Sequence, residues 1–268
     1  GTGACRACMG STPPIASELA HVAGSTAVPL QHRTVGQALA ASVARWPDRP
    51  ALVVPWQDVR WSYQEFARRV GQLARALLAS GLRPGDRVGI WSPNCAEWVL
   101  IQFATAQAGI ILVNINPAYR ISELRFALRK TGCRMLVLAD EFKSSDYLAM
   151  MRELIPELAL ERPGLLLSEE FPDLRVLVNL GAARQPGSLP FQDLLSRAEQ
   201  CDARDLHAIG QGLSPGDAIN IQFTSGTTGT PKGATLSHFN LVNNGFFVGE
   251  GLRLTENDRV CIPVPMYH

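Results

Sequence analysis

The feature that most constrains the fold is an alternation of short strand-like and longer helix-like segments between Asp86 and Ala139. The pattern predicts strands over 87–91, 110–114 and 134–139, with helices over 94–108 and 122–131 between them. A helix between two strands carries the chain back to the edge where the first strand began, so the two strands are expected to be parallel. The sequence therefore predicts an α/β, doubly wound fold, with helices on both faces of a mostly parallel sheet.

The segments on either side of this alternation carry start and stop signals for further elements. Thr34 is the expected N-cap of a first helix that continues to residue 46. A capping-box sequence, Ser62 followed by Glu65, opens a second, amphipathic helix that Gly81 ends. The other expected elements are strands over 51–54, 59–61, 174–179 and 217–223, helices over 144–154 and 191–199, and a surface excursion over 156–172.

Composition excludes several classes of protein. Hydrophobic residues make up 46% of the 268 residues and charged residues 18%, which rules out disorder of the whole chain. Lys plus Arg number 25 and Asp plus Glu number 24, so no excess of positive charge predicts a nucleic-acid partner. The most apolar run, Trp98 to Val113, is interrupted by polar residues and predicts a buried helix and strand rather than a transmembrane segment.

The six cysteines are scattered along the chain, which favours free thiols in a reducing compartment. Cys5 and Cys8 form a C-x-x-C pair, but no second pair or His cluster accompanies it, so we expect no metal site. Both lie in residues 1–33, where Pro and small residues without periodicity predict a poorly ordered N-terminal extension. The chain begins with Gly1 rather than Met, so no targeting peptide can be read from it.

The segment with the clearest chemistry follows the strand expected at 217–223. Residues 223–233 contain three glycines, five hydroxyl side chains and one lysine. Glycines let consecutive backbone N–H groups face an anion, hydroxyls donate further hydrogen bonds, and a lysine adds a positive charge. This mixture predicts a polyphosphate ligand. The candidate nucleotide-binding residues are Thr224, Ser225, Gly226, Thr227, Thr228, Gly229, Thr230, Pro231 and Lys232.

This loop differs from a Walker A loop, in which Gly-Lys-Ser/Thr leads into a helix. Here Pro231 precedes Lys232, Gly233 follows it, and residues 234–237 alternate like a strand. We therefore expect a loop between two strands, able to close like a lid. The competing interpretation is a flexible Ser/Thr/Gly linker, which a buried leading strand and a terminal Pro-Lys-Gly make less favourable.

The loop, Thr224-Ser-Gly-Thr-Thr-Gly-Thr-Pro-Lys-Gly233, resembles the signature loop of the adenylate-forming (AMP-binding) superfamily. Further matching runs are 85–89, 93–94, 104–113, 116–119, 219–223, 234–244 and 265–268. The resemblance covers about residues 34–268 and is strongest to the mitochondrial medium-chain acyl-CoA synthetases. It implies an incomplete N-terminal adenylation domain over 34–268, with the C-terminal domain absent.

The resemblance also implies a two-step reaction of a fatty acid with ATP, Mg2+ and coenzyme A, through an acyl-AMP intermediate. It gives Lys232 the task of neutralising charge on the departing pyrophosphate, and places His268 in the acyl pocket beside the reacting carboxylate. A mitochondrial location is likewise implied by resemblance. Four aromatic residues are expected in the core rather than in the site: Trp91, Trp98, Phe103 and Tyr119.

Two other interpretations remain open from the sequence. The chain could be a non-catalytic binding or interaction module that keeps the phosphate loop, or it could belong to another adenylate-forming ligase, such as an aryl-CoA ligase. The resemblance assigns adenine and ribose contacts and a C-terminal catalytic lysine to positions beyond His268. We therefore predict that the 268-residue chain alone is inactive.

Overall fold

The structure is a computed structural model that describes residues 24, 26–159, 162, 164–224 and 231–268. The chain divides into two units, Gly1–Leu30 and Gln31–His268. In the first unit the described residues, 24 and 26–30, form neither helix nor strand. The extension expected over 1–33 lies mostly outside the described residues and stays a prediction.

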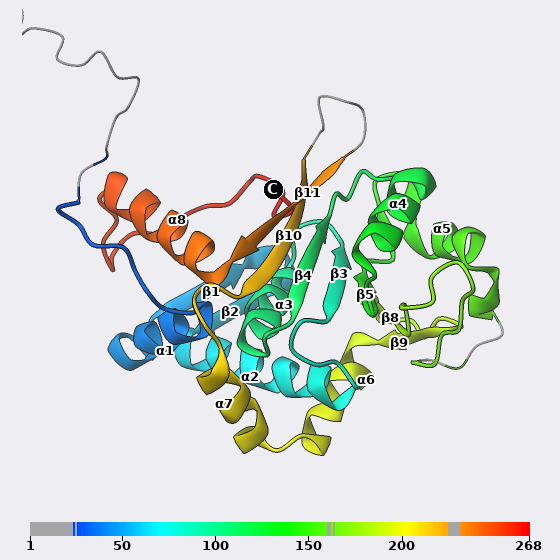
Figure 1. Ribbon diagram of the computed structural model, residues 1–268, viewed down its shortest axis with the longest axis horizontal. Helices are drawn as coiled ribbons and strands as arrows, with labels where there is room; N and C mark the ends of the chain where they lie inside the picture. Colours follow the sequence, from blue (N-terminus) through cyan, green and yellow to red (C-terminus); the bar gives the residue numbers. More distant parts are fainter. Residues whose placement is uncertain (1–23, 25, 160–161, 163, 225–230) are drawn as a thin grey trace, which may run out of the picture. The chain divides into compact units, whose positions relative to one another are not determined.

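The second unit is built on a mixed sheet (Figure 1). Within the described residues its strand order is β11–β10–β4–β3–β5–β8–β9. All neighbours are parallel except β10 and β11, which form an antiparallel hairpin. The strands are β3 (Arg87–Trp91), β4 (Ile111–Ile115), β5 (Met135–Leu138), β8 (Val176–Asn179), β9 (Ser188–Pro190), β10 (Ala218–Thr224) and β11 (Lys232–Ser237). Two small hairpins pair β1 (Pro50–Val54) with β2 (Val59–Ser62) and β6 (Glu141–Phe142) with β7 (Ser145–Asp146).

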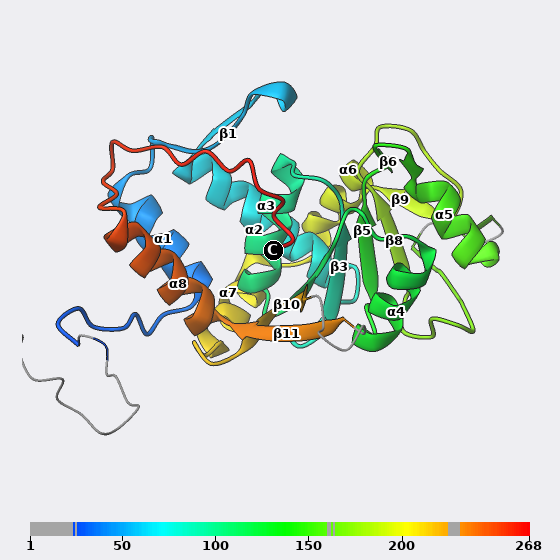
Figure 2. The ribbon, with the colours of Figure 1, turned by 90° about the horizontal axis from the view of Figure 1, so that it is seen from above.

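Helices cover both faces of the sheet (Figure 2). On one face α2 (Tyr63–Ala79) and α3 (Ala96–Gln107) pack on Val88, Ile90 and Leu112. On the other face α4 (Ile121–Thr131) and α5 (Tyr147–Leu154) pack on Val113 and Leu136. The other helices are α1 (Val35–Arg45), α6 (Phe191–Ser196), α7 (Ala203–Gly212) and α8 (His238–Gly251), with short 3-10 turns η1 (Pro55–Gln57), η2 (Pro156–Ala159) and η3 (Arg197–Gln200). The predicted α/β architecture is confirmed.

The local start and stop signals act largely as expected. The Thr34 side chain caps α1 in a full capping box with Gln37, and Gly81 follows α2 with a φ of 88°. At α2 only one of the two capping-box hydrogen bonds forms. The Ser62 hydroxyl accepts from the Glu65 N–H, but the Glu65 carboxylate forms ion pairs with two arginines instead of accepting from the Ser62 N–H. Those arginines, Arg68 and Arg69, lie one turn further along the helix and offer the carboxylate a charged partner.

The expectation of a surface excursion over 156–172 holds for its exposed residues but is wrong for three apolar residues within it. Leu158, Leu166 and Phe171 are each less than 5% exposed and belong to the core beneath α4 and α5. Their irregular spacing hid this burial, since the segment is neither helical nor extended over most of its length. Three further elements, β9, α7 and α8, were not predicted from the sequence.

Candidate functional site

The predicted phosphate loop is carried by the β10–β11 hairpin. Thr224, the last residue of β10, is the cross-strand partner of Lys232, the first residue of β11. The Thr224 hydroxyl donates to the Lys232 carbonyl at 3.4 Å, and both residues are exposed. Ser225, Gly226, Thr227, Thr228, Gly229 and Thr230 lie outside the described residues. The expectation of a loop between two strands is confirmed, and the roles of its residues stay predictions.

The pairing of β10 with β11 places Thr224 and Lys232 at the carboxyl edge of the sheet. Strand β10 runs parallel to β4, with Gln222 beside Asn114, and β4 runs parallel to β3. Thr224, at the end of β10, therefore lies at the same edge of the sheet as the ends of β3, β4, β5 and β8 (Figure 1). Open α/β sheets bind their ligands at this edge.

A buried histidine supports the base of the hairpin. His238 begins α8 directly after β11, is 0% exposed, and accepts a hydrogen bond at Nδ1 from the Val35 N–H at 3.1 Å. This bond requires the neutral ring to carry its proton on Nε2. Burial lowers the pKa of His238, while nearby Asp217 acts in the opposite direction. The role of His238 could not be predicted from the sequence, because its hydrogen bond joins residues 203 positions apart.

A second feature is a cleft of about 710 Å³ between α1, α3, α8 and the C-terminal segment 262–268. Its lining is largely apolar and also includes Asn114 from β4 and Gln222 from β10. The apolar lining includes Trp98, Val99, Phe103, Leu241, Val242 and Phe246. Such a wall suits the hydrocarbon part of a ligand.

His268 lines this cleft, and Asn94 holds the segment that carries it. The Asn94 amide donates from Nδ2 to the Val264 carbonyl and accepts at Oδ1 from the Met266 N–H, each at 2.8 Å. The ring of His268 lies 4.1 Å from that of Tyr267, and the His268 side chain is exposed. Neither Thr224 nor Lys232 lines the cleft, so among the described residues the two predicted catalytic side chains stand in separate features.

Two of the four aromatic residues expected in the core are fully buried there, and the other two are half-buried. Trp91 is 0% exposed and stacks on Tyr147 at 3.6 Å between ring centres, and Trp98 is 3% exposed. Phe103 and Tyr119 are half-buried and pack against the two cores. Trp98 and Phe103 also line the cleft, which the sequence analysis did not predict.

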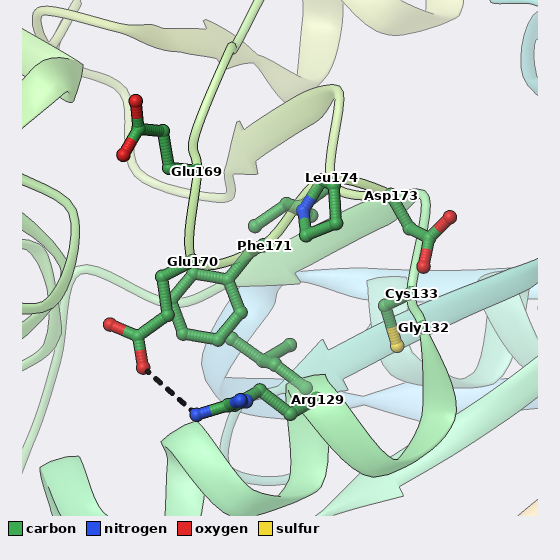
Figure 3. A pocket seen from close by; sticks show the side chains of 10 residues that line it. Arg129, Gly132, Cys133, Glu169, Glu170, Phe171, Asp173 and Leu174 are labelled. Atoms are coloured by element: carbon green, nitrogen blue, oxygen red, sulfur yellow. Dashed lines mark ion pairs between the residues drawn. The ribbon is translucent and has the colours of Figure 1, made fainter.

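Figure 3 shows a smaller pocket of about 330 Å³, with Arg129 paired to Glu170 at its rim. Gly132 and Cys133 precede β5, and Asp173 and Leu174 precede β8, so this pocket lies at the amino edge of the sheet. That is the edge opposite the β10–β11 loop. The pocket is therefore no part of the candidate site.

The described part of the chain contains neither a candidate metal-ligand cluster nor a candidate membrane-spanning helix. Among the described residues, His, Cys, Asp and Glu side chains nowhere gather in a group of three or more that could hold a metal ion. Cys5 and Cys8 lie outside the described residues. In the same part of the chain, no helix is long and apolar enough to cross a membrane.

The chain matches one protein family and several members of it over most of its length. The family model of AMP-binding enzymes matches residues 39–268. The chain is 46% identical over 260 residues to the zebrafish (Danio rerio) protein named "Medium-chain acyl-CoA ligase ACSF2, mitochondrial", and 44% identical over 265 residues to the human protein of that name. These matches cover 96% and 97% of this chain. The chain spans 42% and 43% of the length of these relatives.

Solved structures share the fold. The crystal structure of a putative long-chain-fatty-acid CoA ligase from Rhodopseudomonas palustris superposes with a TM-score of 0.69 at 24% identity, covering 89% of this chain and 53% of that one. A long-chain-fatty-acid-CoA ligase from Archaeoglobus fulgidus gives a TM-score of 0.68 at 22% identity, covering 94% of this chain and 46% of that one. At these identities the likeness establishes the fold alone.

Proposed function

The chain belongs to the AMP-binding enzyme family, and from that premise we propose that the protein converts a fatty acid into its acyl-CoA with ATP. In the first step a carboxylate oxygen attacks the α-phosphorus of ATP, which forms acyl-AMP and releases pyrophosphate. In the second step the thiolate of coenzyme A attacks the acyl carbon, and AMP leaves. Medium-chain acids are the proposed substrates because the zebrafish and human relatives are named for them.

The observation that carries this proposal is the position of the two described residues that bound the hydroxyl- and glycine-rich segment. Thr224 ends β10 and Lys232 begins β11, and the two are cross-strand partners at the carboxyl edge of the sheet. The exposed Lys232 side chain is available to a phosphate, and Gly233 follows it without a side chain to obstruct approach. These residues fit a polyphosphate, and a Mg2+ ion accompanying ATP would neutralise part of its charge.

We assign the two predicted catalytic residues different tasks. Lys232 would stabilise the negative charge that gathers on pyrophosphate as it departs. His268, at the rim of the apolar cleft, would lie beside the carboxylate of an acid whose chain enters the cleft.

The proposed function can be tested in a hybrid protein built from this chain and a relative. Residues 31–268 replace the matching segment of the zebrafish relative, and ATP–pyrophosphate exchange is measured with octanoate, then acyl-CoA formation after coenzyme A is added. We expect octanoate-dependent exchange and acyl-CoA. Exchange supported by benzoate but not octanoate would favour an aryl-CoA ligase. A folded hybrid that exchanges with neither acid would favour a non-catalytic module.

The relatives also suggest where the protein acts. Both are named as mitochondrial, and we propose the same location for this protein. Co-fractionation of the endogenous protein with mitochondrial matrix markers would support it, and exclusive recovery in the cytosolic fraction would contradict it.

A further inference from the structure

Two arginines lie side by side at the amino edge of the sheet. Arg134 directly precedes β5 and Arg175 directly precedes β8, and the residues that follow them, Met135 and Val176, are paired in register. The Arg175 N–H donates to the Arg134 carbonyl at 2.9 Å. Two positive charges on neighbouring positions repel each other, and an anion bound between or beside them relieves that repulsion.

Both arginines line one pocket of about 580 Å³ that also has an apolar part. Leu165 and Leu167 are 63% and 61% exposed, and the Leu166 N–H between them donates to the Arg175 carbonyl at 2.8 Å. This bond holds the leucines beside the arginines, so positive charge and exposed apolar surface occur together. The described residues that line the pocket are Arg134, Arg162, Gly164, Leu165, Leu166, Leu167 and Arg175.

The positive charge of the pocket is only partly compensated within the described part of the chain. Arg134 Nη1 lies 3.7 Å from Asp86 Oδ1, whereas Arg175 forms no ion pair with any described residue. Glu157 and Glu169 line an adjoining pocket together with Arg175, but neither lies within ion-pair distance of its guanidinium. No acidic side chain is among the described residues that line the arginine pocket itself.

We propose that this pocket binds the phosphate head of an amphiphile, whose hydrocarbon part lies on Leu165 and Leu167. Guanidinium groups donate charge-assisted hydrogen bonds to phosphate oxygens, and exposed leucines cover the adjoining methylenes. The pocket lies at the edge of the sheet opposite Thr224 and Lys232, so its ligand leaves the candidate nucleotide site free. The same chemistry belongs to a soluble phosphate ester and to a phospholipid head in a bilayer.

The first experiment changes only the ligand. The 268-residue chain is titrated calorimetrically with octyl phosphate, inorganic phosphate and octyl glucoside. We expect octyl phosphate to bind at least about tenfold more tightly than inorganic phosphate, since each buried methylene contributes about fourfold. We expect it also to bind at least about tenfold more tightly than octyl glucoside, since each arginine near the phosphate contributes about fivefold.

The same chain is then floated with vesicles of phosphatidylcholine, with and without phosphatidic acid. Binding only to the acidic vesicles, or to them and to octyl phosphate, identifies the ligand as a phospholipid head. Binding to octyl phosphate without binding to either vesicle identifies it as a soluble ester. Either result supports an amphiphile with a phosphate head.

The second experiment changes the pocket. Arg175→Gln should weaken the binding of octyl phosphate, or of the acidic vesicles, about fivefold. Arg60→Gln is the matched control, because Arg60 is exposed on β2, forms no ion pair with a described residue and does not line the pocket. Leu165→Gln should weaken binding about fourfold, and Leu252→Gln, which changes a leucine that is 64% exposed outside the pocket, should not.

Three results would overturn the proposal. The first is equal binding of octyl phosphate and inorganic phosphate. The second is unchanged binding in an Arg175→Gln chain whose circular dichroism shows that it is folded, because the phosphate then binds elsewhere. The third is no binding of octyl phosphate up to about 1 mM together with no binding to acidic vesicles. None of these measurements uses ATP or coenzyme A, so they are independent of the exchange assay that tests the proposed function.

Discussion

Lys232 and His238 show how single residues in this chain take opposite roles. Lys232 is exposed at the start of β11, where its charge can face a ligand. His238, six positions later, is fully buried and joins α8 to α1 through a single hydrogen bond. Replacing Lys232 should slow the reaction without changing the stability of the fold. Replacing His238 should change the stability without slowing the reaction.

For Lys232→Ala in the hybrid enzyme, we expect ATP–pyrophosphate exchange to slow by roughly 10- to 150-fold. The lost charge-assisted contact contributes about 1.5–3 kcal/mol to the transition state. The unfolding midpoint should stay unchanged, since the side chain is exposed. Lys130→Ala, which removes another exposed lysine on α4, is the control. An unchanged exchange rate would remove Lys232 from the mechanism.

Because His238 is buried in its neutral form, we expect the free energy of unfolding to fall on mild acidification. Its pKa is lowered in the folded chain, so the unfolded chain binds a proton first as the pH falls below about 6.5. The free energy of unfolding should therefore decrease from pH 7.5 to 5.5, by at most about 1.4 kcal/mol per pH unit from this group. In His238→Asn, whose amide oxygen can accept from the Val35 N–H, urea titrations should show a smaller decrease. An equal decrease in both chains would exclude His238 as its cause.

At the scale of elements, the site depends on contacts between segments that are far apart in sequence. Asn94, just before α3, holds the segment 262–268 with two hydrogen bonds, and those bonds place His268 at the cleft. The Ser237 cap similarly fixes where β11 ends and α8 begins.

Asn94→Ala should free the C-terminal segment without altering the sheet. Both hydrogen bonds are lost, and one of them protects the Met266 amide from solvent. We expect that amide to exchange its hydrogen about tenfold faster, consistent with loss of about 1–1.5 kcal/mol of local stability. Asn244→Ala, which alters an exposed asparagine on α8, is the control. Unchanged exchange at Met266 would show that other contacts hold the segment.

At the scale of the whole molecule, the chain matches relatives more than twice its length. It contains the predicted phosphate-binding segment and the apolar cleft, and the resemblance assigns the adenine and ribose contacts to positions beyond His268. A loop that orders on closing costs roughly 1–2 kcal/mol per fixed residue, which phosphate contacts alone offset poorly.

The 268-residue chain by itself is therefore expected to form no detectable acyl-CoA from octanoate, ATP, Mg2+ and coenzyme A. The hybrid with the zebrafish relative serves as the positive control in the same assay. Mass spectrometry of the purified chain would confirm its length before the assay. Turnover by a verified chain would show that residues 1–268 contain all the groups the reaction needs.

The sequence by itself determined the features that are written locally. The alternation from Arg87 to Ala139 specified the parallel sheet, because hydrophobic period and helix caps act within a few residues. The composition of the loop after β10 likewise indicated a polyphosphate, since its glycines, hydroxyls and lysine are contiguous.

Only the tertiary structure decided which distant residues meet. Leu158, Leu166 and Phe171 are buried because they pack beneath α4 and α5. The residues 156–172 show no hydrophobic periodicity that would predict this burial. The side-chain hydrogen bonds that join Gln102, Asn114 and Asn220 need a helix and two strands to converge, and Asn220 lies more than 100 positions from both partners. Such contacts depend on strand order and register rather than on neighbouring residues, because each amide finds its partner across the sheet or across the layer above it.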